Sequence, residues 1–118
     1  MTHLAEGHIV LMDGAMGTEL DRRDVPMHGK AWSAAAMTTH PDAVRGVHAD
    51  YIGGGARMHI VNSFALARHV LEPAGFGDDV ASFNAKSVAL CREALEVQDA
   101  QDPQWIVGSL STFAAQSD

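Results

Sequence analysis

Residues 11–20 read "LMDGAMGTEL", and this stretch decides the fold class. It completes a short apolar run, Ile9 to Met12, and then changes at once to Asp13, Gly14 and Gly17. A short continuous apolar run predicts a strand buried on both faces, as in parallel sheets that are covered by helices. Small residues directly after a strand let a ligand approach the backbone closely. The stretch therefore predicts a buried parallel strand whose carboxyl end is a candidate ligand site.

Two further stretches resemble this first one in composition. The sequence "RMHIVNSF" (57–64) predicts a second strand centred on Ile60 and Val61, and "WIVGSLSTF" (105–113) predicts a third strand from Trp105 to Ser109. The three predicted strands start about 48 residues apart. This interval leaves room for a helix between each pair of strands.

The stretch "THPDAVRGVHADYIGGG" (39–55) predicts the first main helix. Pro41 suits the first helical position, and Thr39 with Asp42 has the spacing of a capping box. Three glycines, 53–55, can end the helix. Its apolar face, with His48 beside it, is predicted to consist of Val44, Val47 and Tyr51.

A second main helix is predicted after Asp78 or Asp79, either of which can cap it. Residues 20–30 indicate a helix remnant or a loop, and residues 32–37 indicate a short helix. Residues 67–77 indicate a long connection that is broken by Pro73. The apolar face of the second main helix is predicted to comprise Val80, Phe83, Leu90, Cys91 and Ala94.

The resulting order is β-α-β-α-β. Alternation of strands and helices favours an α/β protein with a parallel sheet and right-handed crossovers. We therefore expect one α/β domain with about three parallel strands and two to three helices.

Composition narrows the class of protein. The 118 residues carry a formal charge of −7, which argues against general binding to nucleic acid or to anionic membranes. No apolar run approaches the roughly 20 residues of a membrane span, and the first residues lack the features of a signal peptide. The single cysteine excludes an internal disulfide and fits a reducing compartment. We expect a soluble cytoplasmic protein with no nucleic-acid or membrane partner.

Candidate site residues lie at the three predicted strand ends, where ligands bind in parallel α/β folds. Asp13 could hold a ligand ammonium group, while neighbouring amides such as those of Gly14 and Ala15 could receive a carboxylate, which suits an amino acid. Each feature has a structural alternative. Glycines commonly form turns, Asp13 could cap a helix, and Asn62 could satisfy loop backbone. The remaining candidates are Asn62, Ser63 and Phe64 at the second end and residues 108–111 at the third.

The sequence matches neither a nucleotide-binding loop nor a histidine metal site. The stretch 13–18 lacks the third glycine of a dinucleotide fingerprint and the Gly-Lys-Ser/Thr ending of a phosphate loop. None of the seven histidines has the spacing that places two metal ligands on one helical face, although His40 and His48 share a helix and His59 and His69 flank the second strand end. We therefore expect these histidines to be solvated or at the edge of the core.

The stretch "LMDGAMGTEL" resembles the opening strand and loop of the homocysteine S-methyltransferase family, whose homocysteine-binding domain also occurs in betaine–homocysteine and cobalamin-dependent methionine-forming enzymes. The similarity continues in order over nearly the whole chain. It runs through "AWSAAAMTTHPDAVRGVHADYIGGGA" (31–56), "IVNSFALARHVLEPAGFGDDVASFNAKSVALCREA" (60–94) and "IVGSL" (106–110).

The resemblance implies zinc-dependent methyl transfer to the homocysteine thiol on a (β/α)₈ barrel, because a thiolate is the nucleophile and a metal deprotonates a coordinated thiol. It implies that Asp13 contacts the substrate amino group and that Gly14 and Ala15 lie near its carboxylate. It also implies that Asn62, Ser63 and Phe64 help to line the pocket. The donors of this family include betaine, S-methylmethionine, S-adenosylmethionine and methylated folate or cobalamin.

The sequence departs from this family in two places. The family's zinc ligands are cysteines, whereas the only cysteine here, Cys91, lies on the apolar face of a predicted helix. A buried structural thiol is the better interpretation, so zinc is expected for the complete enzyme with no ligand in this chain. The stretch "GSLSTFAAQSD" (108–118) also replaces a Gly-Pro-rich loop.

A complete barrel takes about 250 residues, so we expect residues 1–118 to form the N-terminal part of a truncated homocysteine-binding barrel domain. Open sheet edges would then favour a partner chain or self-association. Two alternatives to the enzyme remain: a non-catalytic α/β remnant or split subunit that binds a small amino acid or a protein, and a flavodoxin-like domain, which the missing phosphate loop disfavours.

Overall fold

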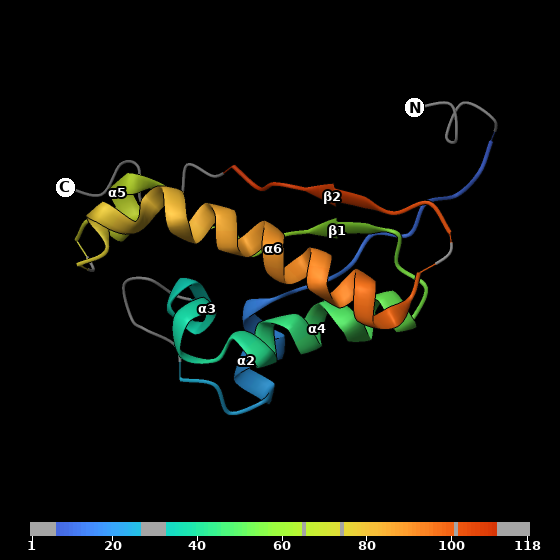
Figure 1. The fold of residues 1–118 in the computed structure, drawn as a ribbon, viewed down its shortest axis with the longest axis horizontal. Coiled ribbons are helices and arrows are strands. Elements are labelled where there is room, and N and C mark those ends of the chain that lie inside the picture. Colours follow the sequence, from blue (N-terminus) through green and yellow to red (C-terminus); the bar gives the residue numbers. More distant parts are fainter. Residues whose placement is uncertain (1–6, 27–32, 65, 74, 101, 111–118) are drawn as a thin grey trace.

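The computed structural model describes residues 7–26, 33–64, 66–73, 75–100 and 102–110. It confirms the α/β class, with helices that alternate with parallel strands (Figure 1). Within these residues, no helix is both long enough and apolar enough to cross a membrane. In chain order, with η denoting 3₁₀-helices, the elements are α2 (Gly17–Arg22), η1 (Ser33–Ala35), α3 (Ala36–Thr39), α4 (Pro41–Gly53), β1 (Met58–Ile60), α5 (Arg68–Leu71), η2 (Gly77–Asp79), α6 (Val80–Gln98) and β2 (Trp105–Val107).

The sheet pairs β1 with β2 in parallel, and Met58 lies opposite Trp105. On the other side of β1, the predicted first strand contributes a single parallel bridge between Met12 and Met58. The amide of Met58 donates to the carbonyl of Leu11 (3.1 Å), and the amide of Asp13 donates to the carbonyl of Met58 (2.9 Å). The expectation of three full strands is therefore wrong for the described residues, although the parallel order of the three segments is as predicted.

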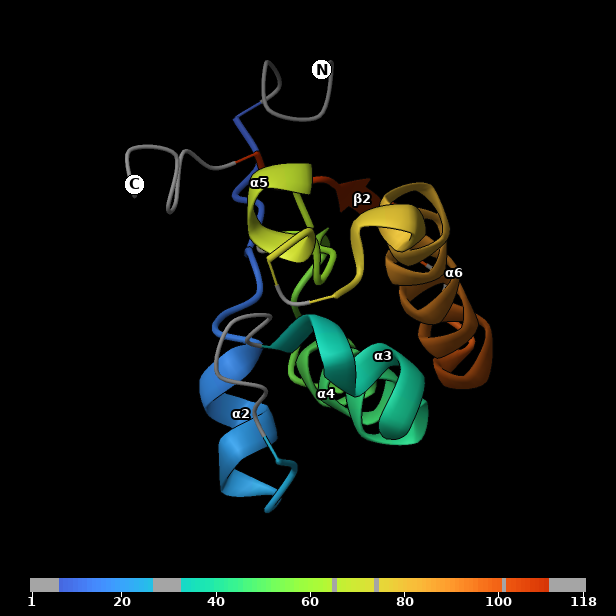
Figure 2. The same cartoon turned by 90° about the vertical axis from the view of Figure 1, so that its left-hand side faces the viewer.

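The predicted burial of the first strand is also wrong. The side chain of Ile9 is 85% exposed and that of Leu11 is 54% exposed. In Figure 2, α4 lies below and α6 to the right of the strands, so both helices lie away from this segment. An apolar run becomes buried only where another element covers it, and among the described residues no helix covers 9–12.

The predicted faces of the two main helices are confirmed. Val44 and Val47 of α4, and Leu90 and Cys91 of α6, are at most 2% exposed. The two helices pack against each other along their length, and α6 also contacts β2 (Figure 1). Together with α2, α3 and α5, which bury Leu20, Met37 and Leu71, these two helices form a helical layer that holds most of the core of the described residues.

The start of α4 differs in one respect from the prediction. Pro41 is the first helical residue, as expected, but His40 is the N-cap and makes no side-chain capping bond. Thr39 belongs to α3, and its hydroxyl donates to the carbonyl of Ala35 (3.1 Å), while Asp42 pairs with Arg45 (2.5 Å). The capping box is therefore absent, because the preceding helix and a local ion pair already use both side chains.

Two stretches expected to be irregular contain short helices. The stretch 20–30 starts inside helix α2, in which Leu20 is fully buried. The stretch 67–77 contains helix α5, which buries Val70 and Leu71. The predicted helix at 32–37 is seen as η1 followed by α3 from residue 33 onward. At the start of α6, Asp79 is the N-cap without a side-chain capping bond.

Candidate functional site

The first and second strand ends are joined by Asp13. Its carboxylate oxygen Oδ2 accepts a hydrogen bond from the backbone amide of Ile60 (3.0 Å), the last residue of β1. The alternative that Asp13 caps a helix is wrong, because the N-cap of α2 is Met16 and no side chain caps it. The acid therefore reaches across the carboxyl end of the sheet.

The second and third strand ends are joined by Ser63. Its hydroxyl donates to the carbonyl of Ser109 (3.1 Å) and accepts from the amide of Ser109 (2.8 Å). Because Ser109 comes two residues after the end of β2, this reciprocal pair lies at the same edge of the sheet as Asp13. Two of the predicted site residues therefore hold the three strand ends together.

The second carboxylate oxygen of Asp13 differs from the first, because no donor lies within hydrogen-bonding reach of it in the described part of the chain. Oδ1 is buried and accepts no hydrogen bond from the described residues. Burial raises the pKa of Asp13, and the Ile60 amide and the nearby His59 act in the opposite direction. A buried carboxylate oxygen without a donor costs free energy, which a cationic or hydrogen-bonding ligand would recover.

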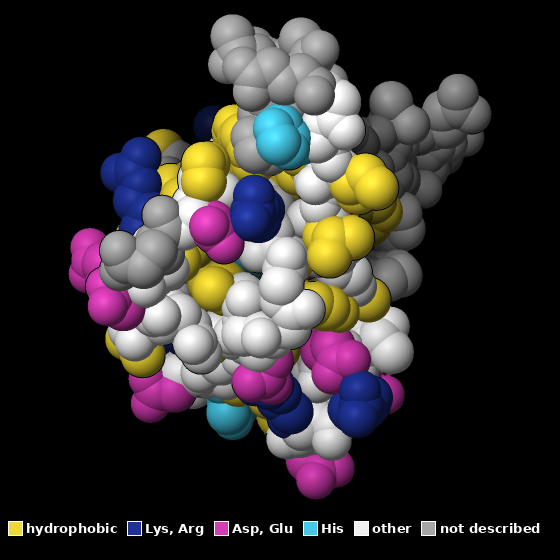
Figure 3. Space-filling view, turned by 90° about the vertical axis from the view of Figure 1, so that its right-hand side faces the viewer, with side chains coloured by type: hydrophobic (Ala, Val, Ile, Leu, Met, Phe, Trp, Pro, Cys, Tyr) yellow, Lys and Arg dark blue, Asp and Glu magenta, His cyan; other side chains and the backbone are white. Residues whose placement is uncertain are grey.

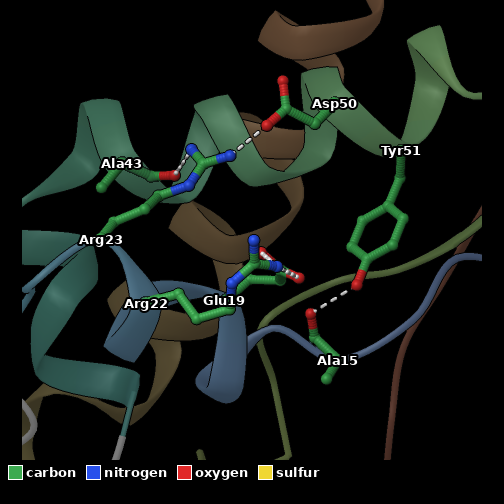
Figure 4. A network of polar contacts seen from close by, with 7 residues as sticks. All are labelled: Ala15, Glu19, Arg22, Arg23, Ala43, Asp50 and Tyr51. Carbon is green, nitrogen blue, oxygen red and sulfur yellow. Dashed lines mark hydrogen bonds and ion pairs between the residues drawn. The ribbon is translucent and has the colours of Figure 1, made fainter.

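The backbone after Asp13 is open to ligands. Gly14 and Ala15 are exposed, and their amide groups donate to no acceptor among the described residues. The carbonyl of Ala15 accepts a hydrogen bond from the hydroxyl of Tyr51 in α4 (2.9 Å), as Figure 4 shows. The sequence placed Tyr51 on an apolar helix face and did not indicate this contact.

The remaining predicted residues follow β1. Asn62 is 5% exposed, Ser63 is 8% exposed and Phe64 is 44% exposed. Their backbone lies at the carboxyl end of the sheet beside the residue that binds Asp13. Contact between these side chains and a ligand stays a prediction.

Two histidines near the site are fully buried, so the expectation of solvated or core-edge histidines is wrong for them. His59 lies in β1, and its Nε2 is 2.7 Å from Oε1 of Gln104. An amide oxygen can only accept, so His59 donates from Nε2. His48 lies in α4, where burial and the nearby His59 lower its pKa to about 4. Two signals in the sequence could have indicated this burial. Side chains alternate between the two faces of a strand, which places His59 on the inner face of β1, and His48 lies on the apolar face of α4.

The described residues do not fit a thiolate zinc site. Cys91 is fully buried within α6, and burial together with the charge of Asp13 raises the pKa of its thiol to about 11. Across the described part of the chain, no three His, Cys, Asp or Glu side chains are grouped so that they could hold a metal ion. Cys91 therefore acts as a small apolar core residue.

A hollow of about 360 Å³ lies between α2 and α4 and is lined in part by Tyr51. Its charged side chains pair with one another: Arg22 with Glu19 (2.7 Å), and Arg23 with Asp50 (Figure 4). Arg22 and Glu19 both belong to α2, so only the pair of Arg23 with Asp50 connects the end of α2 to α4. Among the described residues, the charged side chains that line this hollow are therefore already paired with one another.

Comparison with known proteins identifies the family. A family model described as homocysteine S-methyltransferase matches residues 10–118, so the chain belongs to this family. It is 38% identical over 117 residues to the homocysteine S-methyltransferase of Escherichia coli K12, and the match covers 91% of this chain and 36% of the relative. It is 30% identical over 92 residues to the selenocysteine methyltransferase of Astragalus bisulcatus, covering 77% of this chain and 27% of the relative.

A solved structure agrees with this assignment. The metallated form of the homocysteine methyltransferase MmuM from Escherichia coli superposes with a TM-score of 0.81 and 29% sequence identity. The match covers 95% of this chain and 41% of that chain. The chain thus spans about a third of the length of the curated relatives that it matches.

Proposed function

We propose that this chain supplies the homocysteine-binding strand ends of a homocysteine S-methyltransferase, and that it forms about the first three strands, with two to three helices, of a (β/α)₈ barrel. Membership of the family and the parallel order of the three strand segments support this proposal. The observation that carries it is the buried, unpartnered Oδ1 of Asp13 beside the exposed amides of Gly14 and Ala15.

These groups match the two charged ends of an amino acid. The carboxylate of Asp13 would bind the ammonium group, since a charge-assisted hydrogen bond to a buried acceptor is strong. The amides of Gly14 and Ala15 would donate to the carboxylate. Asn62, Ser63 and Phe64 would line the pocket from the end of β1, and the thiol of homocysteine would extend away from both charged groups.

Methyl transfer needs more than this chain provides. The thiol must lose its proton to become a nucleophile, and the zinc that we assign to the complete enzyme would serve that purpose. The described residues do not fit such a metal, so we place its thiolate ligands outside these 118 residues. The chain alone is therefore expected to bind homocysteine weakly and to transfer no methyl group. The lone cysteine suits a reducing compartment, and we propose the cytoplasm.

A second function is favoured by the uncovered apolar segment. Ile9, Leu11 and Met12 are all more than half exposed, and Figure 3 shows further hydrophobic side chains at the surface among polar and charged ones. Such a surface suits a non-catalytic subunit that binds a partner chain through an open sheet edge.

A chimeric enzyme distinguishes the two functions. Residues 10–110 would replace the corresponding segment of the Escherichia coli relative, and methionine formation from homocysteine would be measured with each class of methyl donor. We expect activity, because the chimera restores both the strand ends and the remainder of the enzyme. A folded chimera that binds zinc but neither binds nor methylates homocysteine would favour the non-catalytic subunit.

Asp13→Ala in the same chimera tests the site itself. We expect homocysteine affinity to fall about 10-fold or more with loss of one charge-assisted hydrogen bond, while zinc content stays unchanged. The matched control is Glu96→Ala, which removes an exposed acid from the last turns of α6 without changing a helix cap. Unchanged affinity in Asp13→Ala would refute the assignment of Asp13.

A further inference from the structure

Tyr51 is the only tyrosine of the chain, and it connects α4 to the loop of the candidate site. Its hydroxyl donates a hydrogen bond to the carbonyl of Ala15 (2.9 Å), across 36 residues of sequence. Figure 4 shows the ring extending from α4 down to this carbonyl. The contact therefore fixes one side of the loop to the helical layer.

Gly14 leaves room for this contact. A Cβ atom at residue 14 would lie 2.8 Å from the hydroxyl oxygen of Tyr51 and 3.2 Å from two ring carbons. No real side chain could be accommodated there without displacing the ring. The glycine is thus needed because the tyrosine approaches the backbone closely, which adds a reason for the Asp-Gly pair in the sequence.

The other side of the loop is fixed by the sheet. The amide of Asp13 donates to the carbonyl of Met58 (2.9 Å), and its carboxylate accepts from the amide of Ile60 (3.0 Å). Residues 13 and 15 are therefore each held by a different element, while the amides of Gly14 and Ala15 stay open. Backbone donors held in this way bind an anion without a further loss of conformational entropy.

We propose that Tyr51 is a positioning residue: it holds the Gly14–Ala15 backbone so that the amides can receive the carboxylate of an amino acid. This role depends on the proposed function in one respect only, which is that the ligand is homocysteine. Tyr51 itself touches the loop and not the ligand. Burial and the charges of Glu19 and Asp13 raise the pKa of Tyr51, so its hydroxyl stays a donor at neutral pH.

The first test measures the loop without a ligand. In the ¹⁵N-labelled 118-residue chain, Tyr51→Phe should change the amide chemical shifts of residues 14–16 and increase their fast motion in ¹⁵N relaxation. The matched control is Ser82→Ala, which removes another hydroxyl that donates to a backbone carbonyl (3.0 Å), at the start of α6. If Tyr51→Phe leaves the loop signals as unaltered as the control does, the proposal is wrong whatever the chain binds.

The second test separates the carboxylate from the ammonium group. L-homocysteine and 3-aminopropane-1-thiol, which lacks the carboxylate, would be titrated into the chain and followed by NMR. We expect Tyr51→Phe to weaken homocysteine binding about 5-fold, the effect of one hydrogen bond, and to leave aminopropanethiol binding unchanged. A merely structural role would lower both affinities equally, which would overturn the proposal.

A double substitution tests whether the contact is direct. Gly14→Ala should weaken homocysteine binding in the native chain, because the new Cβ displaces the hydroxyl of Tyr51. Gly14→Ala should lower homocysteine affinity less in the Tyr51→Phe variant, because the hydroxyl oxygen is absent there. If the effects of the two substitutions on affinity simply add, the contact between the two residues is not direct. If the native chain binds no homocysteine but Tyr51→Phe alters the loop, the proposed function fails and the positioning role stands.

Discussion

The helical layer and the segment at 9–12 are both rich in apolar residues, yet the fold treats them in opposite ways. Leu90 in α6 is 2% exposed, whereas Ile9 is 85% exposed. The helices α4 and α6 cover each other along their length, while the segment at 9–12 lies at the edge of the sheet beside β1 (Figure 1). Hydrophobicity alone therefore does not determine burial, because a side chain is buried only when another element lies against it.

This difference also separates stability from the candidate site. The core of the described residues depends on the helical layer, whereas Asp13, Gly14 and Ala15 directly follow the exposed segment and are held by hydrogen bonds to β1 and to Tyr51. Substitutions in the helical layer should chiefly affect unfolding, and those at the strand ends should chiefly affect binding. The following predictions test that division.

The largest effect is expected for Leu90→Ala in α6. Removal of a fully buried leucine side chain should lower the free energy of unfolding by about 3 to 4 kcal/mol, through lost burial and a new cavity. Val97→Ala on the same helix is the control, because Val97 is 75% exposed and should cost less than about 0.5 kcal/mol. Urea denaturation followed by circular dichroism measures both, and equal costs would contradict the assignment of the core.

The buried imidazole of His48 should make stability depend on pH. Its pKa falls from the ordinary 6.5 to about 4 in the folded chain, so the unfolded chain binds more protons between these values. Stability is fully present above pH 6.5 and should fall by about 2 to 3 kcal/mol as the pH drops toward 4. Asp13, whose pKa is raised, opposes part of this loss at the acidic end.

The contribution of His48 is isolated by substitution. His48→Asn should flatten the dependence of the unfolding free energy on pH, measured by denaturation at a series of pH values. His40→Asn, at an exposed position before α4, should leave the slope as it is in the native chain. A native slope retained in His48→Asn would exclude His48 as its source.

Ser63→Ala should have an intermediate effect. It removes both hydrogen bonds that join the ends of β1 and β2, and the expected loss is about 1 to 2 kcal/mol. Hydrogen exchange of the amides around residues 107–109 should accelerate more than that of α6. A uniform change over the whole chain would show that the serine pair contributes to global stability and not to the strand ends.

The smallest effect on stability is expected for Ile9→Lys. Because the side chain is largely exposed, the free energy of unfolding should change by less than about 0.5 kcal/mol. Self-association through the open sheet edge should decrease, since a lysine on an edge strand disfavours edge-to-edge pairing. Sedimentation velocity over a concentration series measures this, and unaltered association would place the contact elsewhere.

The sequence predicted those features that depend on neighbours in the chain. The buried faces of α4 and α6 follow from residues spaced by about one helical turn, and the site residues Asp13 and Ser63 from their position directly after apolar runs. The capping box at Thr39 and Asp42 failed because the helix α3, which ends at Thr39, changed the role of that side chain. The short helices α2 and α5 were too brief to leave a clear periodic pattern.

By itself, the sequence determined the α/β class, the order of the three strand segments and the two main helices, and the family, because periodicity and motif order are encoded along the chain. Only the tertiary structure decided that residues 9–12 stay exposed, that His48 and His59 are buried, and that Tyr51 holds the loop of the site. The hydrogen bonds of Tyr51 to Ala15 and of His59 to Gln104, for example, join residues 36 and 45 positions apart. No local pattern specifies such a contact, because it exists only after the strands and helices have packed together.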